Sequence, residues 1–337
     1  MTDELVASAK ELAARAHATQ RRKVGDLPYF SHLEAVAQLL IEHGHAAPEL
    51  LAGAYLHDLL EDQPAFAAEL RARLPALVVE MVEALSEPKC DASGQRLPKA
   101  VRFEAYFARV SQGSRAAELA LPISCADKVH NTRSLIDAEA HGVPLLSRLN
   151  TRPGEQLLQL ERLRTLYAGH VAPSLLLEYD AVRAALATTV ERWLFGRAVQ
   201  IAAEAHLSQF DRAGEPYILH PLRLALRAGS RDEQIVSVLH DVVEDSPWQL
   251  SELEREGFPE RVLHALDALT KREHESYHDF IERVAANGLA TRVKLLDLEH
   301  NSDLSRLPSP TDQDRARVEK YQRASQRLLQ VLAKGDK

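Results

Sequence analysis

Apolar residues recur at spacings of three and four along most of the chain, and this period predicts helices. Alanine and leucine, two strong helix formers, fill the periodic segments. No stretch alternates apolar and polar residues as a strand would. Residues 86–98 contain Gly, Pro and several polar residues and read as a long loop. The predicted helices cover residues 33–42, 50–60, 76–85, 154–167, 174–186, 262–269, 277–286 and 314–332.

Four short motifs occur twice in the same order, which indicates a duplicated domain. They are HxxQ, PYxxH, HDxxED and DxxxN. The first copies begin at His17, Pro28, His57 and Asp127, and the second copies begin at His206, Pro216, His240 and Asp297. The sequence therefore predicts an all-α fold of two tandem helical domains, residues 1–172 and 173–337, joined through a helix.

Composition narrows the class of protein. The 337 residues, 45% of them hydrophobic, are enough for two domains with a core each. The net charge of −8 argues against a nucleic-acid partner but leaves a small anionic ligand possible. Two cysteines, Cys90 and Cys125, make no disulfide framework, and no apolar run reaches membrane-spanning length. We expect a cytoplasmic protein without a membrane anchor, and the oligomeric state stays open.

The HDxxED motif gathers four chemically active side chains. On a helix, Glu61 lies one turn beyond His57, and Asp62 lies one turn beyond Asp58. Burying this set without partners would be costly, and a divalent cation removes that cost. Imidazole nitrogen and carboxylate oxygen are common ligands of such ions. A single HDxxED could also be a solvated helix end, but its repetition with matching flanking motifs favours a metal site.

The flanking motifs complete two candidate metal sites, which could activate water and neutralise phosphate charge. A lone histidine such as His17 is more simply a core or capping residue. The first candidate set is His32, His57, Asp58 and Asp127, and the second is His220, His240, Asp241 and Asp297.

These residues resemble the HD hydrolase domain of the RelA/SpoT stringent-response enzymes and the small alarmone hydrolases. The resemblance implies a helical HD-type fold, a Mn²⁺ cofactor and removal of the 3′-pyrophosphate from (p)ppGpp. It also implies that Glu61 and Asp62 orient the water, that Arg22 stacks on guanine beside Lys23, and that Asn131 contacts substrate. The remaining candidates are the phosphate partners Lys99, Arg102 and Lys128 and, in the second copy, the pair Glu244 and Asp245 with Arg212 and Asn301 near substrate.

The second copy departs from the family pattern at its specificity positions. Asp211 stands where the first copy has Arg22, and Leu298 replaces Lys128. An acid offers a base neither a plane nor a positive charge, which disfavours the same substrate mode. The second copy is therefore a hydrolase for another nucleotide or a metal-bound regulatory partner.

The sequence thus predicts a metal-dependent guanosine polyphosphate 3′-pyrophosphohydrolase acting on a small nucleotide. One alternative is a broader nucleotide phosphatase acting on mononucleotides or NADPH. Another is a nucleotide-binding sensor with a non-catalytic second domain, which the intact acid pairs disfavour. A cyclic-nucleotide phosphodiesterase is poorly supported, because the second copy has few additional histidines.

Overall fold

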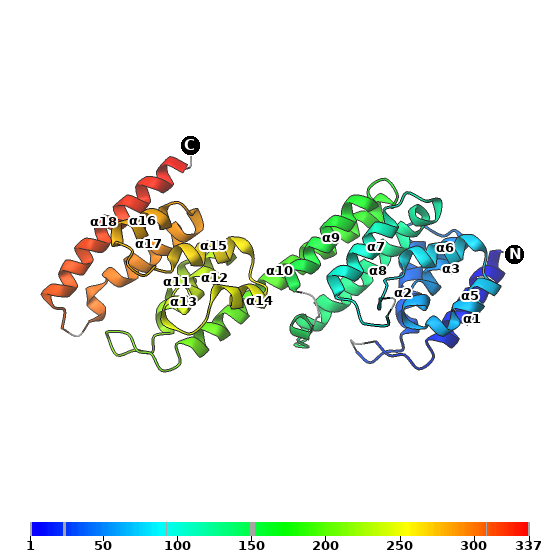
Figure 1. The fold of residues 1–337 in the computed structure, drawn as a ribbon, viewed down its shortest axis with the longest axis horizontal. Helices are drawn as coiled ribbons and strands as arrows, with labels where there is room; N and C mark the ends of the chain where they lie inside the picture. Colours follow the sequence, from blue (N-terminus) through cyan, green and yellow to red (C-terminus); the bar gives the residue numbers. More distant parts are fainter. Residues whose placement is uncertain (1, 23–24, 92, 149–151, 308, 336–337) are drawn as a thin grey trace. The chain divides into compact units, whose positions relative to one another are not determined.

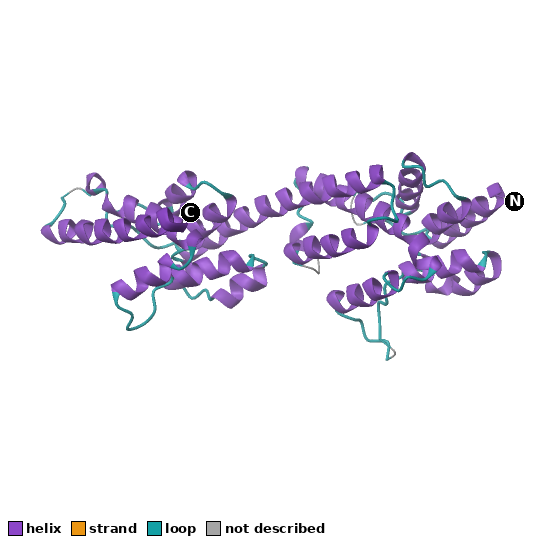
Figure 2. Cartoon of the chain, turned by 90° about the horizontal axis from the view of Figure 1, so that it is seen from above, coloured by secondary structure: helices purple, strands orange, loops and turns teal. Residues whose placement is uncertain are grey.

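The computed structural model describes residues 2–22, 25–91, 93–148, 152–307 and 309–335. These residues form helices and loops without a strand, which confirms the predicted all-α class (Figures 1 and 2). The chain divides into two compact units, Met1–Thr189 and Val190–Lys337. The division lies inside α10 (Pro173–Ala205), which begins at the predicted joint. The domain assignment 1–172 and 173–337 stays a prediction. None of the described helices is long and apolar enough to span a membrane.

In the first unit, α8 is the central helix, and α2, α3 and α6 pack against it. Gly53 allows the close approach of α3, because a Cβ atom there would lie 2.8 Å from Ile123 on α8. The helices that precede α10 are α1 (Thr2–Ala16), α2 (Phe30–Glu42), α3 (Pro48–Leu56), α4 (Leu59–Asp62), α5 (Ala67–Arg73), α6 (Ala76–Leu85), α7 (Lys99–Val110), α8 (Arg115–Ala140) and α9 (Pro153–Tyr167), with short 3₁₀ turns at Pro64–Phe66 and Leu146–Arg148.

In the second unit, α17 takes the central position, and α11, α12, α15, α16 and α18 pack against it. The central helix carries the DxxxN motif, as α8 does in the first unit. The helices are α11 (Leu219–Arg227), α12 (Arg231–Leu239), α13 (Val242–Asp245), α14 (Leu250–Glu256), α15 (Glu260–Leu269), α16 (Tyr277–Ala285), α17 (Gly288–Ser302) and α18 (Asp312–Gly335), with a 3₁₀ turn at Leu304–Arg306.

The continuous helix predicted over residues 50–60 is wrong. Helix α3 ends at Leu56 and α4 begins at Leu59, so that His57 and Asp58 form a turn between them. Asp58 has φ −97° and ψ −1°, a turn conformation that interrupts the helical hydrogen bonds. The second unit has the same break, because Asp241 has φ −101° and ψ −4°. The turn lets two adjacent side chains approach one point.

Candidate functional site

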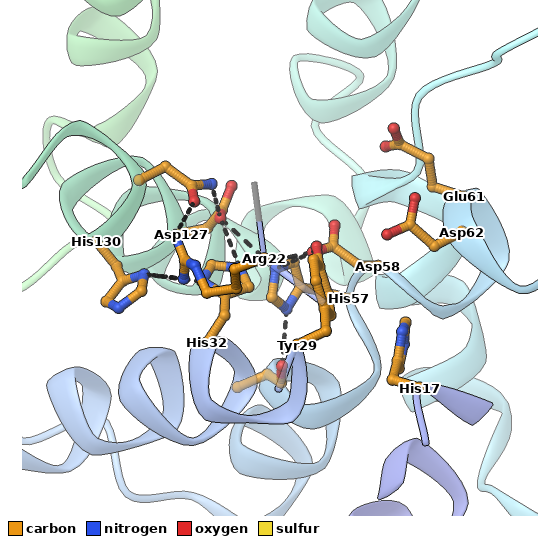
Figure 3. Close-up of polar contacts among 12 residues, drawn as sticks. His17, Arg22, Tyr29, His32, His57, Asp58, Glu61, Asp62, Asp127 and His130 are labelled. Carbon is orange, nitrogen blue, oxygen red and sulfur yellow. Dashed lines mark hydrogen bonds and ion pairs between the residues drawn. The ribbon is translucent and has the colours of Figure 1, made fainter. Parts of the chain in front are cut away.

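Two histidines and two aspartates from α2, the α3–α4 turn and α8 converge in the first unit (Figure 3). The Nε2 atom of His32 lies 3.2 Å from Asp127 Oδ1 and 3.5 Å from Asp58 Oδ2. The Nε2 atom of His57 lies 3.1 Å from Asp58 Oδ2 and 3.6 Å from Asp127 Oδ1. Ligand atoms bound at about 2.1 Å to one ion lie roughly 3–4 Å apart, so the spacing fits a single cation.

Hydrogen bonding directs both histidines toward that point. The Nδ1 atom of His57 donates to the carbonyl oxygen of Ala54 at 2.7 Å, which leaves a lone pair on Nε2. The Nε2 atoms of His32 and His57 are buried without a hydrogen-bond partner among the described residues. Burial without a partner is costly for a polar atom, and a cation would satisfy both atoms.

His130 and Arg22 set the tautomer of His32. The Nη1 atom of Arg22 lies 3.0 Å from Nδ1 of His130, and since a guanidinium only donates, this nitrogen accepts. The Nδ1 atom of His32 lies 2.8 Å from the same nitrogen and must therefore donate. Burial lowers the pKa of His130 to about 4, with His32 and Arg22 adding to the shift, so the ring stays neutral and keeps its acceptor.

The two candidate ligand carboxylates are held by donors on their outer sides. Asp58 accepts from the Tyr29 hydroxyl. Asp127 accepts from Lys128 Nζ at 2.8 Å and from Asn131 Nδ2 at 2.6 Å. Burial raises the pKa of Asp127, but Lys128 and the two histidines outweigh it and hold the carboxyl ionised. In this structure, Lys128 and Asn131 therefore position a candidate ligand.

The acid pair, Glu61 and Asp62, lies beside the four candidate ligands, which we call the metal-type cluster. In Figure 3 the pair lies beyond Asp58. Arg102 donates to Glu61 at 2.9 Å, and Lys89 donates to Asp62 at 2.5 Å. Burial raises the pKa of Glu61 to about 7, with the Asp58 and Glu87 charges adding to the shift, although Lys89 and Arg102 lower it. A carboxyl that titrates near neutrality suits proton transfer.

The second unit repeats the cluster. The Nε2 atom of His220 lies 3.2 Å from Asp297 Oδ1 and 3.8 Å from Asp241 Oδ2. The Nε2 atom of His240 lies 2.9 Å from Asp241 Oδ2 and is buried without a partner among the described residues. Its Nδ1 atom donates to the Ser237 carbonyl at 2.8 Å. The two units therefore offer the same donor set with the same orientation.

The other predicted residues of the second unit surround this cluster. Asn301 donates to Asp297 at 2.5 Å, as Asn131 does to Asp127. Arg212 pairs with Asp314 at 2.9 Å. The acid pair, Glu244 and Asp245, is exposed, and Glu244 accepts from the Lys271 backbone N–H at 3.0 Å.

In the first unit, Lys99 begins α7, three residues before Arg102. Lys23 lies outside the described residues. His17 contacts Gln20 at 2.7 Å and stacks on Tyr29, so it is not brought into the metal-type cluster.

Sequence reasoning missed several side chains that hold the clusters. Tyr29 and His130 contact candidate ligands, and Tyr217 and His300 do so in the second unit. Their signal was the recurrence of Tyr inside both PYxxH motifs and of His immediately before the Asn of both DxxxN motifs. Lys89, which pairs with Asp62, had no counterpart that repetition could reveal.

Comparison with known families finds one match, which lies in the first unit. Residues 9–149 match the family model described as HD domain, and this family implies a divalent metal. The match and the relatives below confirm the predicted resemblance to the hydrolase domains of RelA/SpoT proteins for these residues. The repetition of an HD domain in the second unit stays a prediction.

Several curated proteins are similar to the chain. A probable GTP pyrophosphokinase of Mycobacterium leprae is 31% identical over 150 residues, which cover 41% of this chain and 18% of that protein. A guanosine-3′,5′-bis(diphosphate) 3′-pyrophosphohydrolase of Aquifex aeolicus is 34% identical over 116 residues, covering 32% of this chain and 16% of that protein. A protein of the same name from Borreliella burgdorferi is 32% identical over 135 residues, covering 35% and 20%. The chain thus spans a fifth or less of each relative's length.

A solved structure described as "A metazoan ortholog of SpoT hydrolyzes ppGpp and plays a role in starvation responses" is 24% identical. The comparison covers 53% of this chain and 93% of that chain, with a TM-score of 0.41.

Proposed function

We propose that the first unit is a metal-dependent hydrolase that removes the 3′-pyrophosphate from guanosine 3′,5′-bis(diphosphate), with Mn²⁺ as its metal. The observation that carries the proposal is the pair of buried Nε2 atoms, on His32 and His57, that face two carboxylates without a protein partner. The names of the relatives from Aquifex aeolicus and Borreliella burgdorferi support the choice of substrate.

The metal would be held by His32, His57, Asp58 and Asp127. Two imidazoles with two carboxylates suit Mn²⁺ and related ions. When bound, the metal supplies a Lewis acid that neutralises phosphate charge and makes water more acidic.

The protein's own residues supply the rest of the reaction. Glu61 and Asp62 orient the attacking water and accept its proton, as the pKa of Glu61 near 7 permits. The water oxygen bonds to the phosphorus attached to the 3′ oxygen, the bond from this phosphorus to the 3′ oxygen breaks, and the 3′ oxygen takes up a proton. The products are GDP and pyrophosphate. Arg102, which contacts Glu61 at 2.9 Å, is proposed as a partner of the departing phosphates.

Arg22 is the candidate for contact with guanine. It is half-buried beside His130, and its Nη2 atom lies 3.2 Å from the Ser134 hydroxyl. Lys23 and Lys99 are proposed as further phosphate partners. Lys128 and Asn131 would act through Asp127, which they hold in place.

The test is pyrophosphate release from ppGpp with added Mn²⁺. It compares the whole chain with His57→Ala/Asp58→Ala and with His240→Ala/Asp241→Ala. We expect the first variant alone to abolish release. No release by the unaltered chain with Mn²⁺ bound at its first site would refute the proposal. Tight ppGpp binding without turnover would instead support the sensor, and release of orthophosphate from mononucleotides at the first site would support the broader phosphatase.

A further inference from the structure

The second unit has no arginine at the position equivalent to Arg22, and an arginine from elsewhere in the unit takes its place. An isolated bridge to the proline of the PYxxH motif is made by Arg21 in the first unit and by Phe210 in the second. The following residues, Arg22 and Asp211, are therefore structurally equivalent. The second unit thus has an acid where the first has its half-buried arginine.

Arg306, in the 3₁₀ turn that follows α17, supplies the missing guanidinium. Its Nη1 atom lies 2.9 Å from Nδ1 of His300, where Arg22 Nη1 lies 3.0 Å from Nδ1 of His130. Its Nη2 atom donates to Asp211, so the acid holds this arginine in place. An arginine therefore reaches the equivalent histidine nitrogen in each unit, although Arg22 follows α1 and Arg306 follows α17.

The ammonium group is replaced in the same manner. Lys128 Nζ lies 2.8 Å from Asp127 Oδ2, and its aligned position in the second unit holds Leu298. Lys294, one turn earlier on α17, places its Nζ atom 2.8 Å from Asp297 Oδ2. Both lysines are half-buried, and an ammonium that is partly removed from water is stabilised by pairing, so each belongs to the charge balance of its cluster.

The acid pair of the second unit, Glu244 and Asp245, differs from that of the first unit in its charged partners. Lys89 and Arg102 pair with the acids of the first unit. Among the residues that the structure describes, no lysine or arginine side chain pairs with Glu244 or Asp245. Two carboxylates without a cationic partner would repel a second phosphate group at this end. The second cluster therefore suits a ligand with one phosphate.

A pocket of about 240 Å³ reaches this cluster at His220. Its wall includes Phe210, whose residue surface is 67% exposed, and Tyr321 of α18. Arg317 also lines it and makes no ion pair within the described part of the chain. Exposed aromatic rings can stack on a nucleobase, and an unpaired guanidinium attracts an anion.

We propose that the second unit is a separate metal-dependent phosphomonoesterase for nucleoside monophosphates, with Arg306 and Lys294 as its positioning residues. Water adds to the phosphorus, the ester P–O bond breaks, and the nucleoside leaves with a proton on its oxygen, giving orthophosphate. Glu244 and Asp245 hold the water. This inference goes beyond the activity proposed for the first unit and does not depend on it.

The experiment uses the full chain carrying His57→Ala/Asp58→Ala, so that only the second cluster is intact. Orthophosphate release from AMP, GMP, CMP and UMP is measured with Mn²⁺, and metal occupancy is measured by electron paramagnetic resonance. Calorimetry with inorganic phosphate gives a readout without turnover. We expect release from at least one monophosphate, abolished by adding His240→Ala/Asp241→Ala.

Arg306→Ala is expected to weaken Mn²⁺ and phosphate binding by about 10- to 100-fold, as loss of an outer-shell partner does. Arg306→Lys should recover part of this loss, because lysine can still donate to His300. Arg227→Ala is the matched control, since Arg227 forms an exposed pair with Glu299 on the surface.

Failure to bind Mn²⁺, failure to release orthophosphate, or an equal effect of the control would each overturn the inference. Pyrophosphate release from ppGpp by the second cluster would overturn it as well. The His57→Ala/Asp58→Ala substitutions remove two candidate ligands of the first cluster. Orthophosphate release by this variant therefore supports the inference even if the unaltered chain does not hydrolyse ppGpp.

Discussion

His32 and His130 face each other through their Nδ1 atoms, which lie 2.8 Å apart. His220 and His300 are separated by the same 2.8 Å in the second unit. Only one of two such nitrogens can carry the proton. In both units an arginine donates to the outer histidine, so the inner one must carry it. The outer histidine therefore keeps the Nε2 lone pair of the inner one free for a metal.

Replacing the outer histidine should weaken metal binding. We expect His130→Ala to lower the affinity of the first site for Mn²⁺ by about 10- to 100-fold, because His32 loses the acceptor that fixes its tautomer. A Mn²⁺ titration followed by electron paramagnetic resonance measures this. His141→Ala is the control, since His141 caps the exposed end of the same helix α8. Equal affinities for the two variants would contradict the tautomer argument.

Removing the ammonium that pairs with the buried Asp127 should destabilise the metal-free protein. Lys128→Met leaves Asp127 Oδ2 without its partner, and breaking a buried pair costs on the order of 3 kcal/mol. Urea unfolding in the presence of a chelator measures the loss. Lys10→Met, which breaks an exposed pair with Glu34, should cost less than about 1 kcal/mol. A Lys128→Met loss as small as that of the control would show that Asp127 does not depend on the ammonium.

The repeated motifs made much of the candidate site predictable. The spacing of HDxxED and DxxxN was enough to select His57, Asp58 and Asp127, because a motif that recurs with its flanks reports shared chemistry. Helix α6 was predicted at its exact bounds, since a buried apolar stripe with flanking Pro and Ser marks both of its ends.

The compensating charges were not predictable from aligned positions. Leu298 suggested a lost ammonium, but Lys294 reaches the same carboxylate from the previous turn of the helix. Asp211 suggested a lost guanidinium, but Arg306, from the turn after α17, reaches His300 and pairs with Asp211. An alignment compares positions along the chain, whereas a carboxylate accepts from any donor that the fold brings within reach.

The raised pKa of Glu61 should make stability fall with rising pH. The carboxyl titrates near 4.5 unfolded and at about 7 in the fold, so the folded protein binds this proton more tightly. Its contribution is fully present below pH 4.5 and is lost as pH rises through 7, by up to about 3 kcal/mol. Unfolding of the metal-free chain from pH 5 to 8, compared with Glu61→Gln, isolates the effect. A pH-independent difference between the two proteins would contradict it.

Metal removal should reveal two sites. We expect two Mn²⁺ ions per unaltered chain and one in each of the variants His57→Ala/Asp58→Ala and His240→Ala/Asp241→Ala. An ion present at 100 times its dissociation constant stabilises the fold by about 2.7 kcal/mol. A chelator should therefore lower the melting temperature of the unaltered chain, which differential scanning calorimetry measures. A single ion in the unaltered chain would argue against the second cluster.

The tyrosines of the two PYxxH motifs allow a crossed test. Tyr29 donates its hydroxyl proton to Asp58, and Tyr217 donates to Asp241 at 2.5 Å. Burial and the adjacent aspartate raise the pKa of each tyrosine, so each hydroxyl remains a donor. Phenylalanine keeps the ring and removes only that donor.

Tyr29→Phe should therefore weaken Mn²⁺ binding about 10-fold at the first site and leave the second unchanged, and Tyr217→Phe should do the reverse. The titrations are made in chains whose other site carries the double alanine substitution, so that each affinity is read separately. If one substitution weakened both sites equally, the loss would arise from general destabilisation, because each hydroxyl donates to an aspartate of its own unit. If neither did, the aspartates would be oriented by their histidines alone.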